Sequence, residues 1–235
     1  MSLFGNSKDT IEKLESAGNV QELINAFVEG DQDTSWKAAQ ALGRIKDRRS
    51  VEPLIELLAH GDSDIRWNAA KSLGKIGDRA AVPRLLILLK DEEWYVRWHA
   101  VEALGNIGDE RGVLPLINFL DDKKIRNEVA ISLGKIGDKR AVKSLIRALQ
   151  DGDPDFRSAA AEALGMISDA ETVLPLIDAL KDDDMSVRKH AAGALAMIGD
   201  ERALKPLKEA YRDERWYVRL HMEEAIDEIL AKKGE

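Results

Sequence analysis

A segment with the sequence Ala-Leu-Gly-x-Ile-Gly-Asp, or a close variant of it, recurs through almost the whole 235-residue chain. Its register is marked by Gly43, Gly74, Gly105, Gly134 and Gly165, and continued by Ala196 and Asp227. Successive marks are 31 residues apart, except for 29 residues between Gly105 and Gly134. A period of this length is typical of proteins built from stacked supersecondary repeats. The sequence therefore predicts seven repeats.

Each repeat is expected to form two helices. The first carries apolar residues spaced for one buried helical face, as at Val51, Leu54 and Leu58. A proline recurs in it and is tolerated only near a helix start. The prolines are Pro53, Pro115, Pro175 and Pro206.

The second helix is expected to begin at an aspartate four residues before a recurring arginine and to end at Ile-Gly-Asp. The closing glycine would adopt a left-handed conformation, and the aspartate after it would cap the next element. The fourth repeat is two residues shorter, and the loss falls just before Ile125. The predicted starts are Asp62, Asp122, Asp153 and Asp184, and the predicted closing glycines are Gly77, Gly108, Gly137 and Gly199.

The predicted fold is all-α: a right-handed α-solenoid, or superhelix, of about seven two-helix repeats with terminal caps. We expect a single solenoid over residues 1–235. An N-terminal cap helix is placed at 8–19 and a tail at 231–235. The repeats are placed at 20–46, 47–77, 78–108, 109–137, 138–168, 169–199 and 200–230.

These repeats resemble the HEAT-like repeats of phycobilisome-lyase subunits. The resemblance rests on the pattern Val-Arg-x-x-Ala-Ala-x-Ala-Leu-Gly-x-Ile-Gly-Asp and covers about residues 20–230. It implies the solenoid fold, and it leaves several functions open, because such repeats occur in bilin lyase subunits, in deoxyhypusine hydroxylase and in interaction scaffolds. The hydroxylase would hold iron with His-Glu dipeptides, and none of the four histidines is followed by glutamate.

Composition narrows the choice of function. A net charge of −8 disfavours a dedicated nucleic-acid binder, because phosphate binding depends on clustered Lys and Arg. The absence of cysteine excludes disulfides and thiolate chemistry. The sequence has no secretory signal and no long apolar run, so a cytoplasmic location is expected. No nucleotide-binding loop or nucleophile motif occurs, and we expect neither enzyme activity nor a cofactor.

The positions one, two, five and nine residues after the arginine are expected to line the concave groove of the solenoid. The core stripe lies opposite, at Val96, Ala100, Leu104 and Ile107 around Arg97. In the first repeat, Ser35 stands in the place of the arginine. The groove positions of the first three repeats carry a net charge of +3, and those of the last three repeats carry a net charge of −2. The predicted groove residues are Trp36, Lys37, Gln40 and Arg44; Trp67, Asn68, Lys71 and Lys75; and Trp98, His99, Glu102 and Asn106.

Tryptophan at one position of three successive repeats allows two interpretations. The indoles either stiffen the stack by packing on one another or form an aromatic platform for an extended peptide. We hypothesise a non-enzymatic scaffold that binds an extended, acidic segment of another protein and neither a membrane nor nucleic acid. A subunit of a phycobilin-lyase-like complex is the alternative, followed by a nucleic-acid-binding HEAT protein.

The recurring arginine is interpreted differently. It lies near aspartate-rich turns such as 62–64 and 151–155. A structural ion pair or cap between neighbouring repeats is the predicted role.

Overall fold

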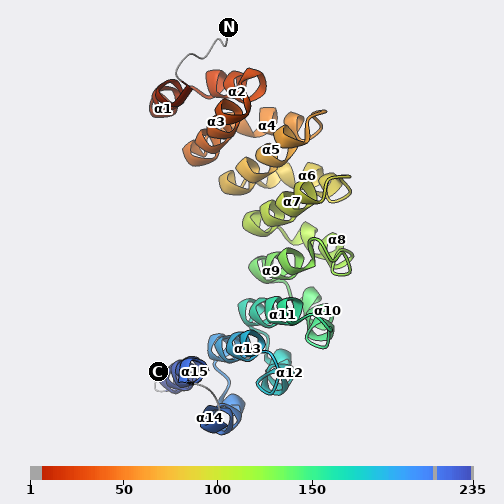
Figure 1. The fold of residues 1–235 in the computed structure, drawn as a ribbon, viewed down its shortest axis with the longest axis vertical. Helices are drawn as coiled ribbons and strands as arrows, with labels where there is room; N and C mark the ends of the chain where they lie inside the picture. The colour runs from red at the N-terminus through yellow and green to blue at the C-terminus, as the bar shows by residue number, and fades with distance from the viewer. Residues whose placement is uncertain (1–6, 214–215, 234–235) are drawn as a thin grey trace. The chain divides into compact units, whose positions relative to one another are not determined.

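A computed structural model describes residues 7–213 and 216–233, which form helices and no β-strand. The chain divides into two compact units, Met1–Gly112 and Val113–Glu235. Within each unit, helix pairs follow one another along the chain (Figure 1). Unit 1 contains α1 (Ser7–Ser16), α2 (Val20–Glu29), α3 (Gln32–Ile45), α4 (Val51–Leu57), α5 (Ser63–Ile76), α6 (Val82–Leu88) and α7 (Trp94–Ile107). Unit 2 contains α8 (Val113–Ile117), α9 (Arg126–Ile136), α10 (Val142–Ala148), α11 (Pro154–Ile167), α12 (Val173–Ala179), α13 (Met185–Ile198), α14 (Leu204–Asp213) and α15 (Trp216–Lys233).

The second helices of successive repeats pack on one another and form one layer in each unit. In unit 1 this layer runs from α3 through α5 to α7, and in unit 2 from α9 through α11 and α13 to α15. The shorter first helices, such as α4 and α6, pack on the second helix of their own repeat. The fold is therefore an α-solenoid, as the repeat period predicts. Helix α1 packs against α3 and α2, at the place expected for an N-terminal cap.

Helix ends follow the predicted chemistry. The closing glycines Gly77, Gly108, Gly137 and Gly199 all have positive φ, between 68° and 79°. Lys46 and Ser168 adopt the same left-handed conformation where glycine is missing. The aspartate that follows then caps a short 3-10 turn, as where the Asp78 carboxylate accepts a hydrogen bond from the Ala80 N–H at 3.0 Å.

One predicted helix start is wrong. Helices α5, α11 and α13 begin directly after Asp62, Asp153 and Asp184, whereas α9 begins only at Arg126. The carboxylate of Asp122 instead accepts a hydrogen bond from the Lys124 N–H within a turn. The two residues that this repeat lacks are missing here. The residues of the expected first helical turn therefore form the connection from α8 instead.

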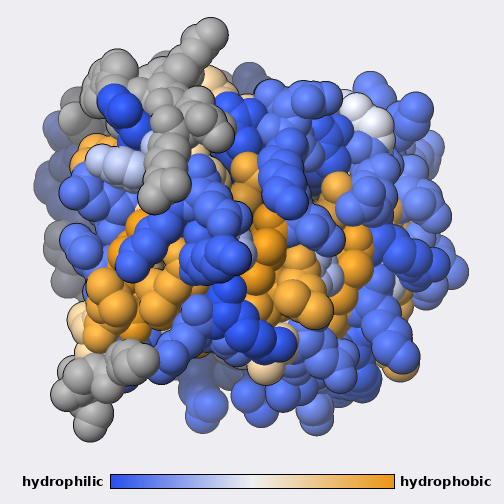
Figure 2. Space-filling view, turned by 90° about the horizontal axis from the view of Figure 1, so that it is seen from below, coloured by the Kyte–Doolittle hydropathy of each residue, from blue (hydrophilic) through white to orange (hydrophobic). Residues whose placement is uncertain are grey.

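The predicted core stripe is confirmed on α7. Val96, Ala100 and Leu104 are no more than 1% exposed, and Ile107 is 9% exposed. On the outside, Figure 2 shows hydrophilic side chains covering most of the visible face, with hydrophobic ones gathered in a band between them.

Three of the recurring arginines, Arg66, Arg126 and Arg157, form ion pairs with aspartates of the next repeat, which confirms the predicted structural role for them. Arg66 forms two hydrogen bonds of 2.7 and 2.9 Å with the carboxylate of Asp91 in the next repeat. Arg157 and Asp182 repeat this arrangement in unit 2. The third guanidinium nitrogen of Arg66, Nη1, donates to the His60 and Gly61 carbonyls, so the side chain also closes the loop of its own repeat.

The C-terminal helix α15 continues to Lys233, so it takes in the first three residues of the predicted tail. The last two residues of that tail, 234–235, lie outside the described residues. No helix in the described ranges is long and apolar enough to cross a membrane.

Candidate functional site

All twelve predicted groove residues lie on three consecutive second helices of unit 1. The three helices α3, α5 and α7 pack side by side, and the twelve residues together are here called the groove face. Helix α3 carries Trp36, Lys37, Gln40 and Arg44, α5 carries Trp67, Asn68, Lys71 and Lys75, and α7 carries Trp98, His99, Glu102 and Asn106.

A histidine connects two of the three tryptophans. The His99 imidazole is stacked on the Trp67 indole, with ring centroids 4.7 Å apart and planes inclined by 19°. The same imidazole meets the Trp98 indole edge to face at 4.8 Å. Among the described residues, none of the three indoles of the groove face is stacked on another of them. The aromatic column is therefore Trp67–His99–Trp98, and Trp36, 43% exposed, stands apart from it.

Hydrogen bonds fix this column in place. The Trp67 Nε1–H donates to the Asp64 carboxylate at 3.1 Å, and His99 Nδ1 lies 3.1 Å from a Glu102 carboxylate oxygen. Asn68 is buried, and its amide donates to the Asp64 carbonyl oxygen at 2.9 Å. Asn68 therefore contributes to the floor of the groove face rather than to its exposed surface.

Two of the four predicted groove cations are already paired. The Arg44 guanidinium forms two 2.6 Å hydrogen bonds with the Glu15 carboxylate of α1, and Lys37 pairs with Asp33 one helical turn away. Sequence analysis missed both partners, because Glu15 and Asp33 lie outside the groove positions whose charges were counted. The i, i+4 spacing of Asp33 and Lys37 was a readable signal. Nothing local indicated Glu15, which is 29 residues from Arg44.

Lys71 and Lys75 remain without an ion-pair partner among the described residues. The Lys71 ammonium lies 5.8 Å from the centroid of the Trp67 ring, within cation–π range. Burial lowers the pKa of Lys75, and the neighbouring positive charges of Lys71 and Arg44 lower it further, against the opposing effect of Glu102. Like charges held this close favour an anion on the groove face.

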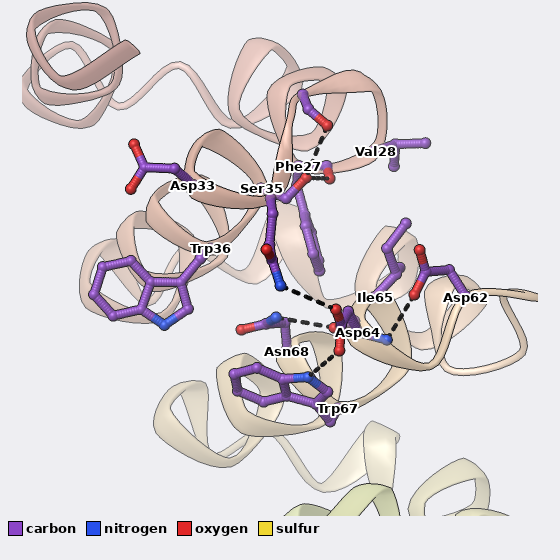
Figure 3. A pocket seen from close by; sticks show the side chains of 12 residues that line it. Phe27, Val28, Asp33, Ser35, Trp36, Asp62, Asp64, Ile65, Trp67 and Asn68 are labelled. Atoms are coloured by element: carbon purple, nitrogen blue, oxygen red, sulfur yellow. Dashed lines mark hydrogen bonds between the residues drawn. The ribbon is translucent and has the colours of Figure 1, made fainter. Parts of the chain in front are cut away.

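A cleft of about 790 Å³ opens at the N-terminal ends of α3 and α5. Trp36 and Trp67 stand beside it, and Phe27 and Ile65 contribute apolar surface (Figure 3). Its charged lining residues are all aspartates: Asp33, Asp62 and Asp64. Repeat positions alone did not indicate this cleft, because most of its lining residues, at the end of α2 and the start of α3 and α5, lie outside the predicted groove positions.

Unit 2 has a smaller hollow, of about 340 Å³, on the corresponding face of α11, α13 and α15. His190 is held by the Ser158 hydroxyl at 2.7 Å, and His221 lies 3.1 Å from Glu224. No group of three or more His, Asp or Glu side chains in the described residues is arranged to hold a metal ion. The charged lining residues of this hollow, histidine aside, are Lys189, Glu162, Glu224 and Glu228.

The family that matches the chain is described as HEAT repeats, and it matches residues 20–93, 82–153 and 143–227. The described helix pairs and this match agree over the same part of the chain. The chain belongs to the HEAT-repeat family. A search of curated proteins finds no significant match.

Among solved structures, the chain is similar to one in the complex of CpcE and CpcF of phycocyanin lyase from Nostoc sp. PCC7120. The two are 25% identical, with a TM-score of 0.62, over 89% of this chain and 94% of that one. An engineered protein is 23% identical with a TM-score of 0.58, over 94% of this chain and 71% of that one. Kap121p shares the fold at 14% identity and a TM-score of 0.68, and the match spans 90% of this chain and 29% of Kap121p.

Proposed function

We propose that the protein is a non-enzymatic scaffold whose groove face binds an extended segment of another protein. The observation that carries the proposal is the juxtaposition of Lys71 and Lys75, which lack ion-pair partners in the described chain, with the Trp67–His99–Trp98 column. Aromatic side chains provide contact area at little entropic cost, and the two ammonium groups select an acidic residue in the bound segment. HEAT repeats present such faces for protein contacts, which supports the same function.

The test is affinity capture from a lysate of the source organism, followed by mass spectrometry. Wild-type protein is compared with a Trp36→Ala, Trp67→Ala, Trp98→Ala variant whose circular dichroism reports on folding. Because Trp67 is partly buried, a second variant, Lys71→Gln with Lys75→Gln, removes charge without opening the core. Lys90→Gln, at an exposed position of unit 1, is the matched control.

Proteins retained by the wild type and by Lys90→Gln, but lost by both groove variants, are the expected result. Equal capture by all four proteins would overturn the proposal. The salt dependence of binding separates protein from nucleic acid: a protein segment gives a modest dependence, whereas phosphate contacts make affinity fall steeply with salt.

A second candidate function is that of a subunit in a lyase-like complex of two HEAT-repeat chains. The similarity to the CpcE and CpcF complex favours it, because it extends over nearly the full length of both chains. A bilin-dependent change in absorbance on mixing the protein with bilin and an acceptor protein would support it. No such change with any partner recovered in the capture experiment would count against it.

A further inference from the structure

We infer that the cleft between Trp36 and Trp67 binds a positively charged side chain, lysine or arginine, of the segment that occupies the groove face. The inference rests on the proposed function and specifies the partner's chemistry. The cleft is large enough for one long side chain and is open to solvent beside Trp36, which is 43% exposed. The charge of the cleft, its aromatic surface and the position of the neighbouring lysines indicate which side chain binds in it.

The charged residues of the cleft favour a cation. Asp33, Asp62 and Asp64 line the cleft, and no Lys, Arg or His side chain does. Asp33 is neutralised by Lys37, but neither Asp62 nor Asp64 has a cationic partner in the described part of the chain. Asp62 accepts only the Asp64 N–H, and the Asp64 carboxylate accepts from Trp67 Nε1 and Gln32 Nε2. Two carboxylates therefore face the cleft with their negative charge uncompensated.

Helix capping accounts for part of this charge, but not for the cleft. An aspartate at a helix start stabilises the helix whether or not a ligand binds, and Asp62 caps α5 in this way. Asp155 occupies the same place on α11 as Asp64 on α5, and it donates its N–H to Asp153 in the same manner. Among the described residues, this carboxylate holds an indole at the edge of an open cleft on α5 alone.

The aromatic walls of the cleft also favour a cation. Tryptophan is the side chain that binds cations best through its ring face, and the alkyl stem of lysine or arginine packs well on an indole. Trp36 from α3 and Trp67 from α5 stand on neighbouring helices beside the same cleft (Figure 3). A carboxylate close to an indole gives a site that prefers a cation over an apolar side chain of the same shape.

The lysines on α5 give the bound segment a polarity. Asp64, Lys71 and Lys75 lie on the same helix, and at 1.5 Å per residue the two lysines are about 10 and 16 Å beyond the aspartate. An extended chain covers roughly 3.3 Å per residue. A segment with a basic residue in the cleft therefore meets the lysines with an acidic residue about three to five positions away.

The first test is independent of any natural partner. The 235-residue chain with 15N-labelled tryptophan is titrated with Nα-acetyl-lysine amide and with Nα-acetyl-norleucine amide, which has a similar side chain without the charge. Single Trp→Phe variants assign the indole signals. The expected result is a saturable shift of the Trp36 and Trp67 signals with the lysine compound alone. Equal shifts with both compounds, or none with either, would overturn the inference.

The second test removes the charge and keeps the hydrogen bond from Trp67 Nε1. Asp64→Asn retains an oxygen that accepts from Trp67 Nε1, and Asp155→Asn is the matched control at the same position of α11. Affinity for the lysine compound should fall about tenfold in Asp64→Asn, the loss of one charged contact, and stay unchanged in Asp155→Asn. Equal affinity in both variants would contradict the inference.

A peptide array separates this inference from the proposed function. Gly-Ser peptides carry one lysine and one glutamate at separations from one to nine residues. Binding that is strongest at separations of about three to five and is lost when lysine becomes norleucine supports the cleft. Binding that depends on the three tryptophans but not on the lysine would overturn the cleft and leave the scaffold function intact. If the lysine compound shifts the tryptophan signals but no protein is captured, the cleft is supported and the scaffold function is overturned.

Discussion

Gly74 lies so close to Ala103 that a Cβ atom added to it would stand 2.7 Å from the Ala103 Cα atom. The same approach recurs in unit 2, where Gly134 faces Ala163 and Gly165 faces Ala194 at 2.7 Å. At these three positions the repeated glycine sets how closely successive second helices pack, and its place inside a helix is explained by this contact rather than by a turn.

Substituting Gly74→Ala is therefore expected to destabilise the protein by about 1–3 kcal/mol, because the added methyl group meets backbone that has to shift. Gly193, inside α13, has nothing within 4 Å of its virtual Cβ. Gly193→Ala should stabilise by roughly 0.5–1 kcal/mol through helix propensity alone. Urea denaturation followed by circular dichroism measures both. Changes of the same sign would contradict this account of helix packing.

The arginine contacts between repeats should contribute measurably to stability. Both side chains of the Arg66–Asp91 pair are largely buried, at 13% and 8% exposed, and two hydrogen bonds join them. Arg66→Met should cost about 1.5–3 kcal/mol, because it leaves the Asp91 carboxylate and two loop carbonyls without their donor. Arg49→Gln, which breaks an exposed pair with Asp47, is the control and should have a much smaller effect. Similar losses in the two variants would argue against the predicted role.

Acid should destabilise the protein partly through Asp109. Hydrogen bonds from Arg111 lower the pKa of this carboxyl to about 2. A pKa that is lower in the folded state gives stability that is present above the unfolded value, near 3.9, and is lost as the pH falls through the folded value. The free energy of unfolding of wild type should therefore drop between about pH 4 and pH 2. Asp109→Asn should show a smaller drop over this range, measured by denaturation at each pH. An identical pH dependence would show that Asp109 does not contribute.

The ion pair between α1 and α3 is expected to restrain the positive charge of the groove face. Glu15 binds Arg44 through two hydrogen bonds, and this contact lowers the Glu15 pKa. In Glu15→Gln, Arg44 becomes available to an anion, so the affinity for the acidic peptides of the array should rise and its salt dependence should steepen. Glu12→Gln, on an exposed face of the same helix, is the control. Fluorescence anisotropy at two salt concentrations distinguishes the two variants, and no difference between them would contradict this role of Glu15.

The repeat period, the helix pairs and the core stripe followed from the sequence alone. They depend on local chemistry: capping at residues such as Asp62, left-handed glycine at residues such as Gly77, and one apolar face such as Val96, Ala100 and Leu104. Each of these acts within a few residues, so its pattern is visible along the chain. The late start of α9 was missed because a two-residue loss is shared between a turn and a helix in a way that local preferences do not fix.

The tertiary structure alone decided how the groove residues are partnered. That His99 stacks on Trp67 and that Glu15 neutralises Arg44 depend on helix-to-helix distances, and that Asp64 holds Trp67 at the edge of an open cleft depends on rotamers. A repeat pattern gives the face on which a side chain lies, whereas the partner across that face is set by close packing between helices. The sequence therefore identified the surface, and packing determined its charge and shape.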